Sequence, residues 1–113
     1  MAKYLISFPS GEMACTPDEL PAVADAAHAV VREAKAAGVW VFGGGIDEAV
    51  PPVRVAADGS VTPGTYPQTQ RLEGGYSVLE CATREEAVHW AAKIAAACRC
   101  AQELRVFMHD PEV

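Results

Sequence analysis

His28 is the side chain in this sequence that best suits acid–base chemistry. It falls in a long apolar segment that predicts a helix, beside the apolar stripe and one turn from Ala24 and Arg32. An imidazole can act as a base near neutral pH when a carboxylate or carbonyl holds one ring nitrogen and leaves the other free. Asp47 is the best candidate for that carboxylate, because its loop leaves a predicted strand after three glycines and can fold back toward the helix. A boundary histidine that only packs its ring is the alternative.

A second group of polar side chains lies in the middle of the chain. Arg54, Tyr66 and Gln68 offer a cation, a phenol and an amide that could converge on a small anionic or aromatic ligand. Loops on a rigid scaffold often carry such sites, but the surface residues of an ordinary loop explain the same pattern equally well.

The four cysteines are expected to be reduced thiols, since the chain is too apolar to need a disulfide framework. Cys98 and Cys100 could be considered as metal ligands together with Cys81 or His109. Their spacing is not that of a C-x-x-C zinc site, and Cys98 belongs to the apolar face of a predicted helix, so no metal is expected.

Charge and motifs narrow the classes of partner. The net charge is -6, and the nine basic residues are scattered, which argues against binding to nucleic acid. No apolar stretch is long enough to span a membrane, and the apolar run after Met1 has only the length of a strand, so neither a membrane anchor nor a secretory leader is expected. The three glycines at 43–45 open no helix and so form no phosphate-binding loop. We therefore expect a cytoplasmic protein without a cofactor, whose partners are small molecules or proteins.

The elements that must position these residues form two strand–helix–strand units. The first has a strand at 4–8, a helix at about 17–37 that opens with the capping box of Thr16 and Glu19 and ends at Gly38, and a strand at 39–42.

The second unit has a strand at 76–81, a helix that begins after Thr83, and a strand at 103–108. Its helix carries one apolar face and places His89 on the opposite, solvent side. The apolar face comprises Ala87, Trp90, Ala91, Ile94 and Cys98, with Ala95 at its edge. Between the two units, Asp58-Gly59 predicts a hairpin, followed by a loop at 63–70.

These units predict a single α+β domain over residues 1–113: a ferredoxin-like two-layer sandwich of two βαβ units with an inserted hairpin. Right-handed crossovers would place both helices on one face of the sheet. The strand at 39–42 is apolar on both alternating sets, with Trp40 and Phe42 expected on one face and Val39 and Val41 on the other. One subunit can cover only one of these faces, so we expect a homodimer in which two sheets close into a dimeric α+β barrel.

The C-terminal half carries a resemblance to a known family. The segment Pro63-Gly64-Thr65-Tyr66-Pro67-Gln68-Thr69-Gln70, the following Gly74-Gly75-Tyr76, the Ala-rich helix and residues 98–105 resemble the YCII-related family in its DGPF branch. The four residues after which the branch is named correspond to Pro63-Gly64-Thr65-Tyr66, which keep the glycine and an aromatic and lack the acid.

The resemblance implies a dimeric α+β barrel and two classes of function. DGPF proteins are often linked to sigma factors, which favours a ligand-sensing or protein-docking accessory domain. A few relatives are small enzymes that act on ring compounds through a His/Asp pair, which here would be His28 and Asp47, with an offset of one residue for the histidine. The favoured hypothesis is the accessory domain, and the alternative is a cofactor-independent enzyme acting on a small ring or carbonyl compound.

Overall fold

The first helix begins close to the predicted capping box. In the computed structural model, which describes residues 1–113, a 3₁₀ turn (Pro17–Glu19) leads into α1 (Leu20–Ala36). The Glu19 carboxylate accepts a hydrogen bond from the Thr16 N–H at 2.9 Å. At the other end, Gly38 adopts the predicted left-handed conformation with φ of +76°. The α-helix itself is therefore shorter than predicted by three residues at its start and one at its end.

The second helix, α2 (Arg84–Cys98), is capped as predicted. The Thr83 hydroxyl accepts from the Glu86 N–H, and the Glu86 carboxylate accepts from the Ala82 N–H, each at 3.1 Å. Its last turn ends in Arg99, a non-glycine residue in the left-handed region with φ of 58°.

Arg99 connects the end of α2 to the start of α1. Its guanidinium donates to the Glu19 carboxylate at 2.6 Å. The Thr16 backbone N–H, and then Arg99, lower the pKa of Glu19 from 4.5 to about 2. One carboxylate thus ties together two helix termini that are distant in the sequence.

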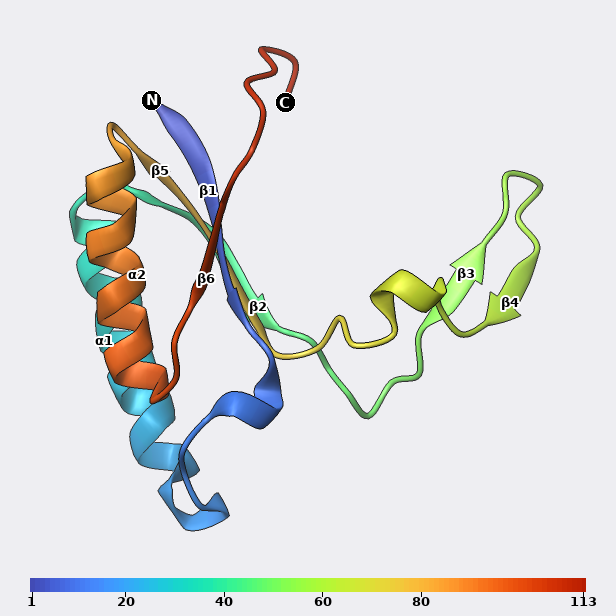
Figure 1. The fold of residues 1–113 in the computed structure, drawn as a ribbon, viewed down its shortest axis with the longest axis horizontal. Helices are drawn as coiled ribbons and strands as arrows, with labels where there is room; N and C mark the ends of the chain where they lie inside the picture. Colours follow the sequence, from blue (N-terminus) through green and yellow to red (C-terminus); the bar gives the residue numbers. More distant parts are fainter.

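Both helices lie on one face of a four-stranded antiparallel sheet (Figure 1). The strand order is β2-β5-β1-β6. The strands are β1 (Ala2–Phe8), β2 (Trp40–Gly45), β5 (Gly75–Cys81) and β6 (Glu103–Val106). The predicted α+β architecture is confirmed at this level, as two strand–helix–strand units whose strands share one sheet.

The core lies between the helices and the sheet, on the strands β1 and β5. Ile6, Leu79 and Cys81 are its fully buried large side chains, and Trp90 of α2 packs against this cluster. The predicted apolar face of α2 is confirmed, since Ala87, Trp90, Ala91 and Cys98 are buried and Ile94 packs against the core. His89 is exposed, as predicted.

The predicted direction of Trp40 and Phe42 is wrong, because the pairing register of β2 shifts between them. Trp40 pairs with Leu79, a core residue, whereas Phe42 pairs with Val78, the next residue along β5. Adjacent residues on a strand point to opposite faces. Trp40 therefore lies on the helix side, while Phe42 lies on the other face and is 65% exposed.

The face of the sheet away from the helices carries uncovered apolar side chains. Leu5 of β1 and Phe42 of β2 both pair with Val78 of β5, which places the three side chains in one row. Hereafter this surface is called the open face.

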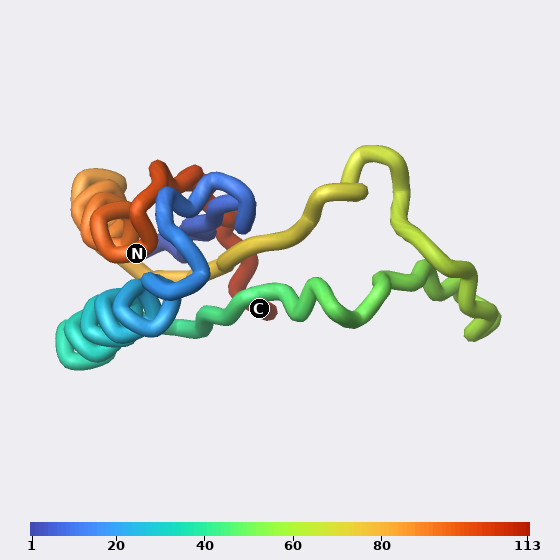
Figure 2. The backbone as a smooth tube through the Cα atoms, turned by 90° about the horizontal axis from the view of Figure 1, so that it is seen from below, coloured from blue at the N-terminus to red at the C-terminus, as the bar shows by residue number.

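The predicted hairpin forms a separate two-stranded sheet of β3 (Val53–Val55) and β4 (Val61–Pro63). It belongs to an arm, residues 50–72, that extends from the ends of β2 and β5 on the side of the sheet opposite the helices (Figures 1 and 2). Neither helix of the structure has the length and apolar character needed to cross a membrane.

Candidate functional site

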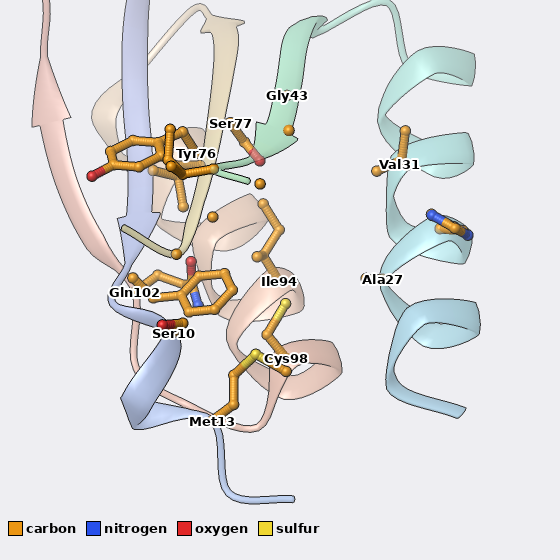
Figure 3. A pocket seen from close by; sticks show the side chains of 18 of the residues that line it. Ser10, Met13, Ala27, Val31, Gly43, Tyr76, Ser77, Ile94, Cys98 and Gln102 are labelled. Carbon is orange, nitrogen blue, oxygen red and sulfur yellow. The ribbon is translucent and has the colours of Figure 1, made fainter. Parts of the chain in front are cut away.

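A cavity of about 560 Å³ separates α1 from the lower half of the sheet (Figure 3). Ala27 and Val31 of α1 line one side, and Ile94 of α2 closes another. Glycines form most of the floor, namely Gly43, Gly44, Gly45, Gly74 and Gly75. The cavity exists because Ala27 and Val31 on the helix are small and glycines replace larger residues where β2 ends and β5 begins.

Three of the five glycines of the floor, Gly43, Gly74 and Gly75, are required by the close approach of Trp40 and Phe8. A Cβ at Gly43 would lie 2.4 Å from the Trp40 ring, and one at Gly75 would lie 2.5 Å from the Phe8 ring. Both rings therefore lie against backbone, and both line the cavity. Gly74 has φ of +96°, and its Cβ would lie 1.9 Å from the Phe8 carbonyl oxygen, so no other residue fits there without a backbone shift.

Polar residues from several elements border the cavity. His28 and Lys35 come from α1. Glu48 comes from the loop after β2, and its carboxylate accepts a hydrogen bond from the Ser10 hydroxyl at 3.2 Å. Gln102 contributes an amide that donates to the Cys100 carbonyl at 3.3 Å. A cation, an imidazole and a hydrogen-bonded carboxylate thus border an otherwise apolar space, an arrangement typical of small-molecule sites.

One end of the cavity is lined by sulfur. The side chains of Met13 and Cys98 meet there (Figure 3). Burial, and then the nearby Cys100, raise the pKa of Cys98 above its usual value of 9.0. Cys98 is therefore a neutral thiol near pH 7 and lacks the thiolate needed for nucleophilic attack.

The structure places His28 and Asp47 differently. His28 lines the cavity with its side chain exposed, but Asp47 does not line it. The Asp47 carboxylate accepts from the Ala49 N–H at 3.0 Å and borders a separate hollow of about 420 Å³ at the base of the arm. No hydrogen bond or ion pair joins Asp47 to His28, so their joint role in catalysis stays a prediction without a direct contact to support it.

The acidic residue that lines the cavity together with His28 is Glu48. The sequence analysis missed this residue because it identified the loop correctly but chose its first acid. In a strand, successive side chains point to opposite faces, but an irregular loop has no such regularity. The sequence therefore does not show which of Asp47 and Glu48 faces the cavity. The signal in the sequence that could have found the cavity itself is the presence of two glycine runs, at 43–45 and 74–75, beside predicted strands.

The three predicted ligand-binding residues lie on the arm and do not line the cavity. Arg54 stacks over the ring of Tyr66, with its Cζ 5.8 Å from the centroid, and Tyr66 is 66% exposed. Gln68 lies in a 3₁₀ turn (Pro67–Thr69) nearby in the chain and is exposed. Two of the three therefore meet, but on a surface remote from the cavity, and their role in ligand binding stays a prediction.

The other sulfur and acidic groups do not form a metal site. The four cysteines are free thiols, and nowhere do three His, Cys, Asp or Glu side chains gather closely enough to hold an ion.

Comparison with known proteins adds no assignment. No protein-family model matches the chain, and no curated protein matches it either.

Proposed function

We propose that this protein is a small ligand-binding accessory domain, and that its ligand occupies the cavity between α1 and the sheet. The cavity carries the proposal: a space of about 560 Å³, within the usual range for small-molecule sites, is bordered by two aromatic rings and a few polar groups.

The lining indicates the chemistry of the ligand. The Trp40 and Phe8 rings suit a flat apolar body, since aromatic side chains stack on ring compounds. Lys35 and His28 suit a carboxylate or another anionic group at the α1 side of the cavity. A small aromatic or cyclic carboxylic acid combines both features.

We further propose a ferredoxin-like fold that dimerises through the open face into an α+β barrel. The antiparallel strand order β2-β5-β1-β6, with both helices on one face, supports the ferredoxin-like arrangement. The apolar row of Leu5, Phe42 and Val78, in which Phe42 is exposed and the other two are half-buried, supports dimerisation. By resemblance to the DGPF branch, this homodimer would act in the cytoplasm as a sensing or docking accessory linked to a sigma-factor-related partner.

Ligand binding can be tested with a matched pair of variants on α1. Ala27→Leu adds bulk inside the cavity, whereas Ala26→Leu adds the same bulk at an exposed position of the same helix. A panel of aromatic and short aliphatic carboxylates is screened by thermal shift and by quenching of the tryptophan fluorescence, which comes from Trp40 at the cavity and from Trp90 in the core. We expect binding to the native protein and to Ala26→Leu, and a loss of affinity of at least about tenfold in Ala27→Leu. If no compound binds the native protein, or if Ala27→Leu binds equally well, the cavity is not the ligand site.

A second candidate function is an enzyme that needs no cofactor. The observation that favours it is the presence of His28 and Glu48 on the same cavity, with Asp47 in the adjoining loop. These groups could move a proton on a ring or carbonyl compound bound there. Replacing His28 with Asn would then lower turnover of a bound compound by about two to four orders of magnitude and leave its affinity nearly unchanged. If the bound compounds are never transformed, the accessory function stands alone.

A further inference from the structure

The arm has an amphipathic hairpin with nothing packed on its apolar side. The register pairs Val53 with Pro63 and Val55 with Val61, so these four side chains share one face of the ribbon. Arg54 pairs with Thr62 on the other face, where Arg54 stacks on Tyr66. The three valines are between 52% and 66% exposed. An isolated two-stranded hairpin is marginal in water, so an uncovered valine face indicates a missing partner.

The position of the arm indicates where that partner lies. In both views the arm leaves the sheet on the side away from the helices, which is the side of the open face (Figures 1 and 2). The molecule measures 43 Å along its longest axis, which runs from the helices through the sheet to the arm. Packed sheets lie only about 10 Å apart, so a body seated on the open face lies within reach of the arm.

The distribution of charge indicates what kind of partner lies on the open face. Residues 50–72 hold Arg54, Arg71 and Asp58 as their only charged side chains, which makes the arm slightly cationic. The rest of the chain holds seven basic and fourteen acidic residues and is strongly anionic. The arm therefore complements the body of a second copy of this chain, whereas two bodies alone would repel each other.

We infer that the arm clasps a second copy of this chain, packing its face of Val53, Val55, Val61 and Pro63 against the body of that copy. The inference rests on the proposed dimer through the open face and adds a second contact to it. In a two-fold dimer each arm reaches the other subunit, so the contact is made twice. The arm also explains how a small open face can hold an anionic dimer together.

Photocrosslinking in the full chain tests the contact. Val55 is replaced by p-benzoylphenylalanine, and the control carries the same residue in place of Val88, an exposed valine on α2. Irradiation should give a covalent dimer of twice 11.9 kDa only with the residue at position 55, and mass spectrometry should find the linked peptide outside residues 50–72. A native dimer that gives no such crosslink overturns the arm inference and leaves the dimer proposal intact, whereas a native monomer overturns both.

A second measurement does not depend on crosslinking. Val55→Asp should raise the dimer dissociation constant at least about tenfold, because it puts a charge in the apolar contact. Thr62→Asp introduces the same charge on the opposite face of the ribbon and should have a much smaller effect. Equal effects of the two variants would show that the valine face is not buried in the dimer, and would overturn the inference.

Discussion

Alanine substitutions at Gly74 and Gly64 test how closely the backbone packs beneath the cavity. Both residues have nearly the same positive φ, +96° and +95°. A Cβ on Gly64 would meet nothing within 4 Å, whereas a Cβ on Gly74 would lie 1.9 Å from the Phe8 carbonyl oxygen and 2.8 Å from the Ser10 nitrogen. Alanine at the two positions therefore imposes the same backbone strain, with a steric clash at only one of them.

The expected losses of stability follow from these contacts. Gly64→Ala should lower the free energy of unfolding by about 1 kcal/mol, the usual penalty for alanine in the left-handed region. Gly74→Ala suffers the same penalty and also displaces the end of β1, since backbone cannot yield as a flexible side chain can. Overpacking of this kind costs about 1–3 kcal/mol more, which gives a total of about 3 kcal/mol. Domains of this size have about 5–15 kcal/mol of stability, so the Gly74 variant should still fold.

Urea denaturation followed by circular dichroism measures the free energy of unfolding of both variants and of the native protein, and heating followed by the same signal measures the midpoint of thermal unfolding. The midpoint of thermal unfolding should fall by roughly 4 °C for Gly64→Ala and by roughly 12 °C for Gly74→Ala. Equal losses in the two variants would contradict the close approach of Gly74 to Phe8, and with it the account of the cavity floor.

Three further predictions concern the dimer, the helix junction and the thiols. Val78→Asp on the open face should give a particle of 11.9 kDa in light scattering or an insoluble chain, because dimerisation would bury an unpaired charge; an unchanged dimer would refute the interface. Glu19→Gln should be less stable than the native protein above pH 4.5, and this difference should shrink as the pH falls toward 2, because the folded pKa of Glu19 lies below its ordinary value; a constant difference in urea titrations would contradict the lowered pKa. A thiol reagent applied after denaturation without reductant should count four groups, with Cys98 slow to react in the native state, and stoichiometric zinc in elemental analysis would overturn its assignment as a core thiol.

The local signals in the sequence were sufficient for the type and order of the elements, although β2 continues to Gly45 and β6 ends at Val106, where strands at 39–42 and 103–108 were predicted. Capping residues such as Thr83 and the glycine at position 38 act within one turn of the backbone, so they mark helix ends without tertiary information. The alternating apolar residues of the strands and the Asp-Gly turn act equally locally. The register shift in β2 could not be predicted, because a bulge depends on how β2 pairs with β5 and leaves no mark in β2 alone.

The candidate site depended on non-local packing, and there the sequence analysis succeeded only in part. His28 was predicted from its residue type and its place on the helix, and it does line the cavity. Glu48 was missed because its direction is set by the loop and by its hydrogen bond to Ser10, which lies 38 residues away in the chain. Arg54 of the predicted hairpin and Tyr66 of the following loop were assigned to one ligand; the two residues do meet, but on an arm that projects away from the sheet and helices.

The same glycines form the floor of the cavity and the base of the arm. The runs at 43–45 and 74–75 meet where β2 ends and β5 begins, with Gly45 paired to Gly75, and this is also where the arm leaves the sheet. Without side chains, that end of the sheet leaves room beneath α1 for a ligand, and its backbone is held in place by Phe8 and Trp40. The same junction carries the arm toward the open face. Under the proposed function, a ligand that presses on the glycine floor would act on the backbone that anchors the arm, and this would connect the cavity to the proposed dimer contact.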